Sequence, residues 1–197
     1  MSLLLLPVGH SLGATVDPSS GVLAHRVRVG PDVVRLSEPQ FTIWALTHGA
    51  SDRDALLSTA AGLPDATGLL AGLVDEGLVA AVEPGTPAAS EFAESHQLKP
   101  LMLGLGNLPD DPDTYQIGLP GQPVAAVGAV LYRLYQWGHL ETDLWAACRA
   151  TAAVSGAEFA DPYALLDSVL TAASTLLSPN AACLDTAAPH GLAREGR

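Results

Sequence analysis

The sequence DATGLLAGLV at residues 65–74 returns in outline as DPYALLDSVL at residues 161–170. In each stretch an aspartate is followed by leucine or valine at four positions spaced i, i+1, i+4 and i+5, which form one apolar helix face. The aspartate can cap such a helix by accepting a hydrogen bond from an amide of the first turn. The two stretches therefore predict equivalent helices and indicate an internal repeat.

Two more helices are expected before each of these, in the same order. The sequence IWAL at residues 43–46 corresponds to LYRL at residues 131–134, and a glycine follows each segment, as at a helix end. Short alanine-rich helices come next, with Asp54 matched to Asp143. The repeat thus extends well beyond its clearest helix.

Each proposed module also opens with a hairpin of two short strands around a Gly/Pro turn. The strand segments are residues 25–30 and 33–36 in the first module and residues 115–118 and 123–127 in the second. After the third helix comes an apolar closing strand, at residues 78–82 in the first module and residues 175–177 in the second. Each copy thus has the order hairpin, three helices, strand.

The predicted fold class is α+β, with two winged-helix-like modules in tandem. We place the first module at residues 1–84, a linker rich in glycine and proline at 85–96, the second module at 97–185 and a flexible tail at 186–197. Such a duplication can give a pseudo-dimeric monomer, because one chain then supplies what other proteins obtain by dimerising. The oligomeric state itself does not follow from the sequence.

Three segments of the first module carry a family resemblance: VVRL at residues 33–36, LTHG at 46–49 and EGLV at 76–79. In these segments the chain resembles the PqqD-like winged-helix module, a small domain that binds leader peptides of ribosomally made natural products. The resemblance implies a peptide site between the hairpin edge and the third helix. The second module has Ala172-Ala173-Ser174 where the first has Glu76-Gly77, and winged-helix transcription regulators share the same pattern.

The charge balance separates these two functions. The chain has 197 residues, with 9 Lys and Arg against 21 Asp and Glu, so its net charge is −12. Residues 54–98 and 150–193 contain no lysine or arginine, so both third helices lack the cations that phosphate contacts use. We therefore expect a non-catalytic adaptor that binds a protein or peptide, with a DNA-binding winged-helix regulator as the alternative.

The candidate partner-binding residues are Arg26, Arg28, Arg35, Tyr132 and Trp145. Arg26 and Arg28 are two residues apart, so they share one face of a strand. That face either is simply solvated or pairs with the carboxylates of an acidic segment that docks at the hairpin edge. Tyr132 and Trp145 belong to an aromatic cluster that either packs the core or forms a binding surface. On the second interpretation neither ring is fully buried.

A third interpretation comes from the sequence GHSLG at residues 9–13, which has the G-x-S-x-G pattern of a serine esterase. Only eight residues precede this motif, and a turn-rich segment rather than a helix follows it. This context disfavours the esterase.

We expect neither a cofactor nor a metal ion, because the six histidines are scattered and the two cysteines, Cys148 and Cys183, lie outside any metal-binding spacing. Four leucines before Pro7 are too few for a signal-peptide core, and no stretch is long enough to span a bilayer. The expected location is the cytoplasm, with no membrane association.

Overall fold

The computed structural model describes residues 3–16, 21–49, 52–156 and 159–187 and shows a mixed α+β fold, as expected. The first half contains β1 (Leu4–Pro7), β2 (His10–Val16), β3 (Leu23–Val29), β4 (Asp32–Leu36), α1 (Glu38–Leu46), α2 (Arg53–Thr59), α3 (Ala66–Asp75) and β5 (Val79–Val82). Helix α4 (Pro87–Ser95) connects it to the second half. That half contains β6 (His96–Pro100), β7 (Leu103–Leu108), β8 (Asp111–Leu119), β9 (Gln122–Gly128), α5 (Ala129–Trp137), η1 (Gly138–Leu140), α6 (Leu144–Val154), α7 (Pro162–Ala172), α8 (Ser174–Leu177) and β10 (Ala182–Thr186).

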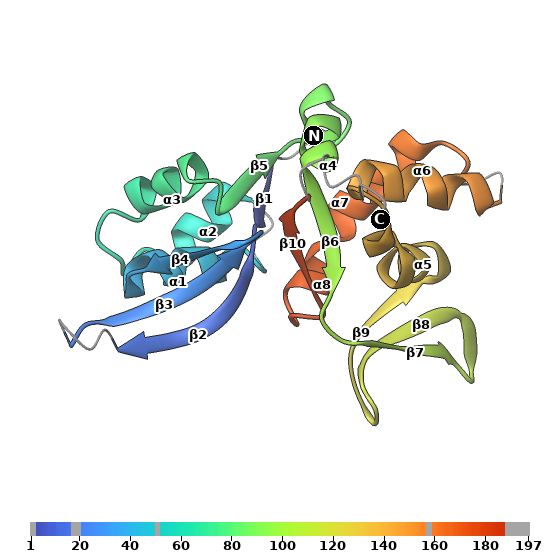
Figure 1. The fold of residues 1–197 in the computed structure, drawn as a ribbon, viewed down its shortest axis with the longest axis horizontal. Coiled ribbons are helices and arrows are strands. Elements are labelled where there is room, and N and C mark those ends of the chain that lie inside the picture. The colour runs from blue at the N-terminus through green and yellow to red at the C-terminus, as the bar shows by residue number, and fades with distance from the viewer. Residues whose placement is uncertain (1–2, 17–20, 50–51, 157–158, 188–197) are drawn as a thin grey trace, which may run out of the picture.

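The strands pair in the same pattern in both halves. Each half has a three-stranded antiparallel sheet, β2-β3-β4 in the first and β7-β8-β9 in the second. In each half the first and last strands form a separate antiparallel pair, β1 with β5 and β6 with β10. In Figure 1 the first half lies to the left of α4 and β6, most of the second half lies to the right, and the three-stranded sheets extend away from the centre.

The helix caps repeat as well. The predicted caps are confirmed: the side chain of Asp65 accepts from the amide of Gly68 at 3.1 Å, and that of Asp161 accepts from the amide of Tyr163 at 2.9 Å. The preceding helix begins after Asp52 in the first half and after Asp143 in the second, and both aspartates accept from the amide three residues later. The counterpart of Asp143 is therefore Asp52 and not Asp54, because the capping residue precedes the helix.

The closing strand of the second half is not where we predicted it. Gly77 and Asn180 both have left-handed backbones, with φ of 70° and 53°. After each, an amide donates back to a helix carbonyl, in a Schellman-type end that matches residues 78–82 to 181–185. The apolar residues 175–177 therefore lie in α8, and Thr186, which we assigned to the tail, ends β10. The rest of the tail, 188–197, lies outside the described residues.

The first helices of the two halves are also offset from the predicted register by one helical turn. Both are nine residues long and follow an extended cap residue, Ser37 before α1 and Gly128 before α5. Counted from these caps, Trp44 corresponds to Tyr135, and both rings bind backbone near the end of the first strand of their half. Trp44 donates from Nε1 to the carbonyl of Val8 at 3.2 Å, and Tyr135 donates from its hydroxyl to Met102 at 2.7 Å.

The segment 85–96, which we expected to be a linker, contains α4 (Pro87–Ser95) and the first residue of β6, His96, and α4 belongs to a core. Phe92 and Ala93 of this helix are buried together with Leu6 and Val82 of the first half and with the helices of the second. A second cluster, around Ile43 and its neighbours, fills the first half. The halves also meet at a parallel bridge between Val8 and Leu184. None of the helices in the described ranges is both long and apolar enough to cross a membrane.

Candidate functional site

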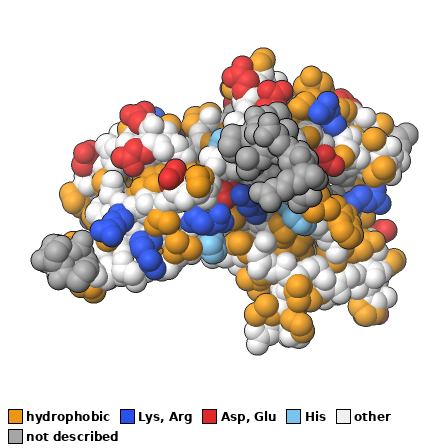
Figure 2. All heavy atoms as spheres, viewed as in Figure 1, with side chains coloured by type: hydrophobic (Ala, Val, Ile, Leu, Met, Phe, Trp, Pro, Cys, Tyr) orange, Lys and Arg blue, Asp and Glu red, His pale blue; other side chains and the backbone are white. Residues whose placement is uncertain are grey.

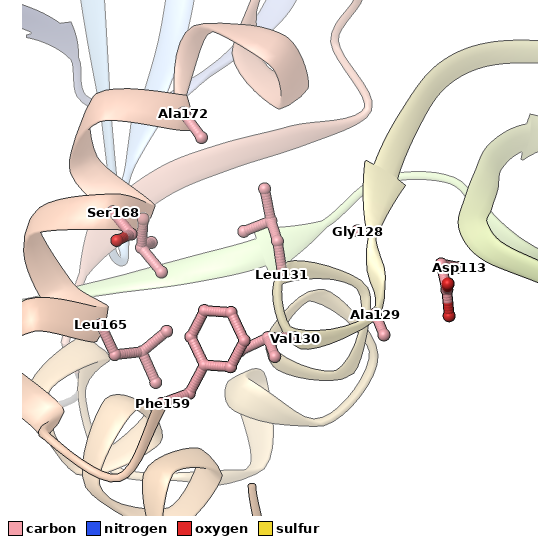
Figure 3. Close-up of a pocket in the computed structure, with 10 residues that line it drawn as sticks. Asp113, Gly128, Ala129, Val130, Leu131, Phe159, Leu165, Ser168 and Ala172 are labelled. Carbon is pink, nitrogen blue, oxygen red and sulfur yellow. The ribbon is translucent and has the colours of Figure 1, made fainter. Parts of the chain in front are cut away.

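A hollow of about 530 Å³ lies between the start of α5 and the helix α7 (Figure 3). Its lining is mostly apolar: Gly128, Ala129, Val130, Leu131, Phe159, Leu165, Val169 and Ala172. Asp113 and Ser168 are the polar residues that line it, and Figure 3 shows them on opposite sides. We call this hollow the α5–α7 groove.

The sequence of the first turn of α5 leaves this groove open. Gly128 caps the helix without a side chain, and Leu131 of the first turn points from α5 toward α7 (Figure 3). On the opposite wall, Asp161 and Pro162 start α7, which places Leu165 on the groove side. The ring of Phe159, just before α7, lies between Leu165 and Val130. Apolar side chains from three places in the chain thus share one concave surface.

The groove lies beside a sheet edge. Among the described strands, β9 pairs with β8 alone, so its outer backbone is not part of a ladder. An exposed edge of this kind can accept an additional extended chain through backbone hydrogen bonds. Gly128, where β9 ends, is also part of the groove lining. The edge and the apolar hollow are therefore adjacent and can contact the same ligand.

The corresponding positions in the first half are more polar. Counted from the helix caps, Gln40 takes the place of Leu131, and Glu76 takes the place of Ala172. The side chain of Gln40 is already used, since its Oε1 accepts hydrogen bonds from the amide of Ser37 at 3.0 Å and from the Ser37 hydroxyl at 2.8 Å. The second half has no such cap, so the leucine remains available to line the groove.

The structure places the predicted aromatic residues differently. Tyr132 is only 7% exposed, so the expectation that it is accessible is wrong. Its ring stacks on Tyr115 at 4.6 Å, and its hydroxyl accepts from the amide of Gly106 at 3.0 Å, so it is a core residue that holds the sheet against α5. Trp145 is half-buried and packs against the exposed ring of Tyr163. Trp137 is 60% exposed, so the aromatic cluster is not completely enclosed.

The predicted arginines lie on the first sheet, far from the groove in the chain. Arg26 is directly opposite Arg35 across β3 and β4. Arg28 is not a free cation, because its Nη1 forms an ion pair with Oδ2 of Asp185 in β10 at 3.2 Å, although its side chain stays partly exposed. Sequence patterns gave no signal for this pairing, since the two residues belong to different halves.

The GHSLG segment forms no nucleophile elbow. Ser11 lies within β2, and the chain then enters β3 rather than a helix. Its Oγ accepts from the amide of Gly13 at 3.3 Å.

Burial and the charge of Asp143 raise the pKa of the Cys148 thiol to about 12, and burial and Asp185 raise the pKa of Cys183 to about 11, so both thiols stay protonated at neutral pH.

Within the described ranges, no group of three or more His, Cys, Asp and Glu side chains could hold a metal ion. No protein-family model, curated protein or solved structure matches the chain. The function of the chain must therefore be inferred from its own residues.

Proposed function

We propose that this protein is a non-catalytic adaptor that binds an extended segment of a partner protein or peptide in the α5–α7 groove. In this proposal the two halves are winged-helix-like modules similar to the PqqD-like module, and the second half holds the binding site. The observation that carries the proposal is the open apolar groove beside the edge of β9 that no described strand pairs with.

The groove and the edge would contribute different parts of the binding. Backbone groups of an added strand would pair with β9, which gives affinity with little dependence on sequence. An apolar side chain of the same segment would enter between Leu131 and Leu165, where burial of one leucine-sized group contributes about 1.5–3 kcal/mol. Asp113 is the charged residue among those that line the groove, so a neutral or basic neighbour is favoured over an acidic one.

The polar lining supports binding rather than chemistry. The hydroxyl of Ser168 donates to the carbonyl of Ala164 at 2.9 Å, which is a local helix contact. Asp113 belongs to the other wall of the groove (Figure 3). A nucleophile and its base would need to be within hydrogen-bond reach of each other. The arrangement therefore favours recognition of a ligand over its conversion.

A display selection on the full chain tests this proposal. Random peptides selected on the wild type would be measured for binding to Leu131→Gln, which installs the residue of the first half in the groove. The matched control is Leu140→Gln, the same change at an exposed leucine of η1 that is 69% accessible. We expect apolar, strand-forming peptides whose affinity falls at least about tenfold with Leu131→Gln and is unchanged with Leu140→Gln. Peptides that bind the wild type and both variants equally well would refute the groove as the binding site.

A further inference from the structure

The outer face of the first sheet has a cluster of cations. Strand β3 points Val27 into the core, where it is fully buried, so Arg26 and Arg28 point to the opposite face. The register places Arg35 opposite Arg26 on that face. Residues that are directly opposite in an antiparallel pair share one side of the sheet. All three arginines thus lie on the face of β2-β3-β4 that the helices leave uncovered.

The cluster continues into the second half through Lys99. The carboxylate of Asp185 accepts from Lys99 Nζ at 2.8 Å, while Arg28 Nη1 lies 3.2 Å from the same oxygen. One carboxylate therefore holds two cations side by side and leaves a net positive charge. We name Arg26, Arg28, Arg35 and Lys99 the basic row. Figure 2 shows blue side chains in a band from the first half toward the junction, while most red side chains of this view lie above it.

This concentration is unusual for a chain of net charge −12. The basic row holds four of the seven lysines and arginines of the described ranges. A scattered distribution would be sufficient for solubility, because isolated surface charges need no neighbours of the same sign. The row instead creates a local positive potential that can attract and orient an anionic partner.

Arg26 lies directly opposite a second cation, Arg35, across strands β3 and β4. In addition, Arg26 Nε is buried without a hydrogen-bond partner in the described part of the chain. A buried donor that remains unsatisfied costs free energy. Arg26 as a whole is only partly buried, so it is the residue of the row at which we expect an anionic partner to bind first.

We propose that the basic row binds an acidic segment of a partner protein, in extended conformation and with carboxylates at every second position. Arg26 and Arg28 are two residues apart in a strand, which separates them by roughly 6.6 Å along the sheet. Side chains i and i+2 of an extended peptide have the same spacing. Arginine also matches a carboxylate through two parallel hydrogen bonds.

Carboxylates fit this face better than a nucleic acid does. Nucleic-acid binding draws on many phosphate contacts, and the rest of this acidic chain would repel the flanking phosphates. The row offers only a few cations and is too short for that. The surface lies on the first half and is separate from the α5–α7 groove, so the inference goes beyond the proposed function and does not depend on it.

Fluorescence anisotropy on the full chain tests the basic row with three labelled probes. The first is a peptide of alternating glutamate and serine, the second has the same composition arranged as paired glutamates and paired serines, and the third is a single-stranded oligonucleotide of equal charge. The variants are Arg26→Glu and Arg26→Gln, with Arg149→Glu as the matched control because Arg149 is exposed on α6. Leu131→Gln is included to separate this surface from the groove.

We expect the alternating peptide to bind the wild type more tightly than the paired peptide or the oligonucleotide. Arg26→Gln should weaken it by about twofold to fivefold and Arg26→Glu by more, because reversal adds repulsion to the lost ion pair. Arg149→Glu and Leu131→Gln should leave its affinity unchanged. If Arg149→Glu weakened peptide binding as much as Arg26→Glu does, the net charge of the protein would explain the effect and the proposal would be overturned. Tighter binding of the oligonucleotide, equal affinity for the two peptides, or no peptide binding at all would also overturn it.

Discussion

Arg28 of the first sheet and Asp185 of the last strand form an ion pair across the two halves of the chain, with 3.2 Å between Nη1 and Oδ2. Asp185 is fully buried and also accepts from the amide of Gly30 at 2.6 Å and from Lys99 at 2.8 Å. Each oxygen of the carboxylate therefore has a partner. This site joins β3, β6 and β10, and it fixes the first sheet against the second half.

Replacement of Asp185 by asparagine should strongly destabilise the protein. The change removes the negative charge of Asp185 from a site that keeps the cations Arg28 and Lys99, and it places an amide where their donors point. Loss of one partner from a buried pair costs about 3–5 kcal/mol, but Arg28 and Lys99 retain some contact with water, so we expect about 2–4 kcal/mol. Urea unfolding followed by circular dichroism measures this difference. Asp113→Asn, at an exposed position, is the control and should change stability by less than about 0.5 kcal/mol.

The same carboxylate should make stability depend on acidity. Burial acts to raise the pKa of Asp185, but the hydrogen bond from Lys99, the amide of Gly30 and the charges of Lys99 and Arg28 outweigh it, and the pKa is lowered. The stabilisation is therefore complete above the unfolded pKa of about 3.9, and it is lost as the pH falls through the lower folded value. The gap in unfolding free energy between wild type and Asp185→Asn should shrink below about pH 4. A gap that is constant down to pH 2.5 would show that the charge of Asp185 contributes nothing.

Two glycines of the first half, Gly72 inside α3 and Gly77 just after it, should respond in opposite directions to alanine. Gly77 has φ of 70°, and a Cβ there would meet no atom within 4 Å, so the cost of Gly77→Ala is conformational. We expect a loss of about 1–2 kcal/mol. Gly72 lies inside α3 with equally open space, so Gly72→Ala should gain up to about 1 kcal/mol through helix propensity. Thermal unfolding of both variants checks the pair, and a gain with Gly77→Ala would contradict the left-handed assignment.

Local signals in the sequence predicted those parts of the fold that depend on neighbouring residues. The caps at Asp65 and Asp161 were predictable because the aspartate and the amide that it binds are two or three residues apart. The register of α5 was not, because an apolar pattern with a period near 3.6 looks similar after a shift of three or four residues. The start of the closing strand in the second half was also not predictable, because Asn180, after α8, occupies the left-handed position that Gly77 holds in the first half.

Contacts between residues that meet only in the folded chain could not be predicted from the sequence. Arg28 and Asp185 form an ion pair, but the residues next to each of them in the sequence give no indication of this pairing. The α5–α7 groove depends on Phe159 and Leu131, which in the sequence are one aromatic among ten and one leucine in a helix. A comparison of corresponding positions could have found the second of these, because Gln40 completes a cap that Gly128 and Leu131 lack. This comparison of Gln40 with Leu131 is possible only when α1 and α5 are aligned in the correct register.

The capping difference leads to a test that separates stability from binding. The double variant Gly128→Ser with Leu131→Gln would give α5 the cap that Ser37 and Gln40 give α1. The backbone of Gly128 is already extended, with φ of −70° and ψ of 164°, and a Cβ there meets no atom within 4 Å, so serine fits. The new cap should contribute about 1 kcal/mol, which offsets the lost burial of a partly exposed leucine.

We therefore expect the double variant to unfold at a denaturant concentration close to that of the wild type while it loses at least about tenfold in affinity for groove-selected peptides. Denaturant titration and fluorescence anisotropy on the same preparations measure the two quantities. Gly128→Ser alone is the matched control. It should be more stable than the wild type and bind groove-selected peptides more tightly than the double variant does, because Leu131 still lines the groove. If the single variant loses binding as well, the first turn of α5 acts through its backbone, and the leucine is not the contact that holds the ligand.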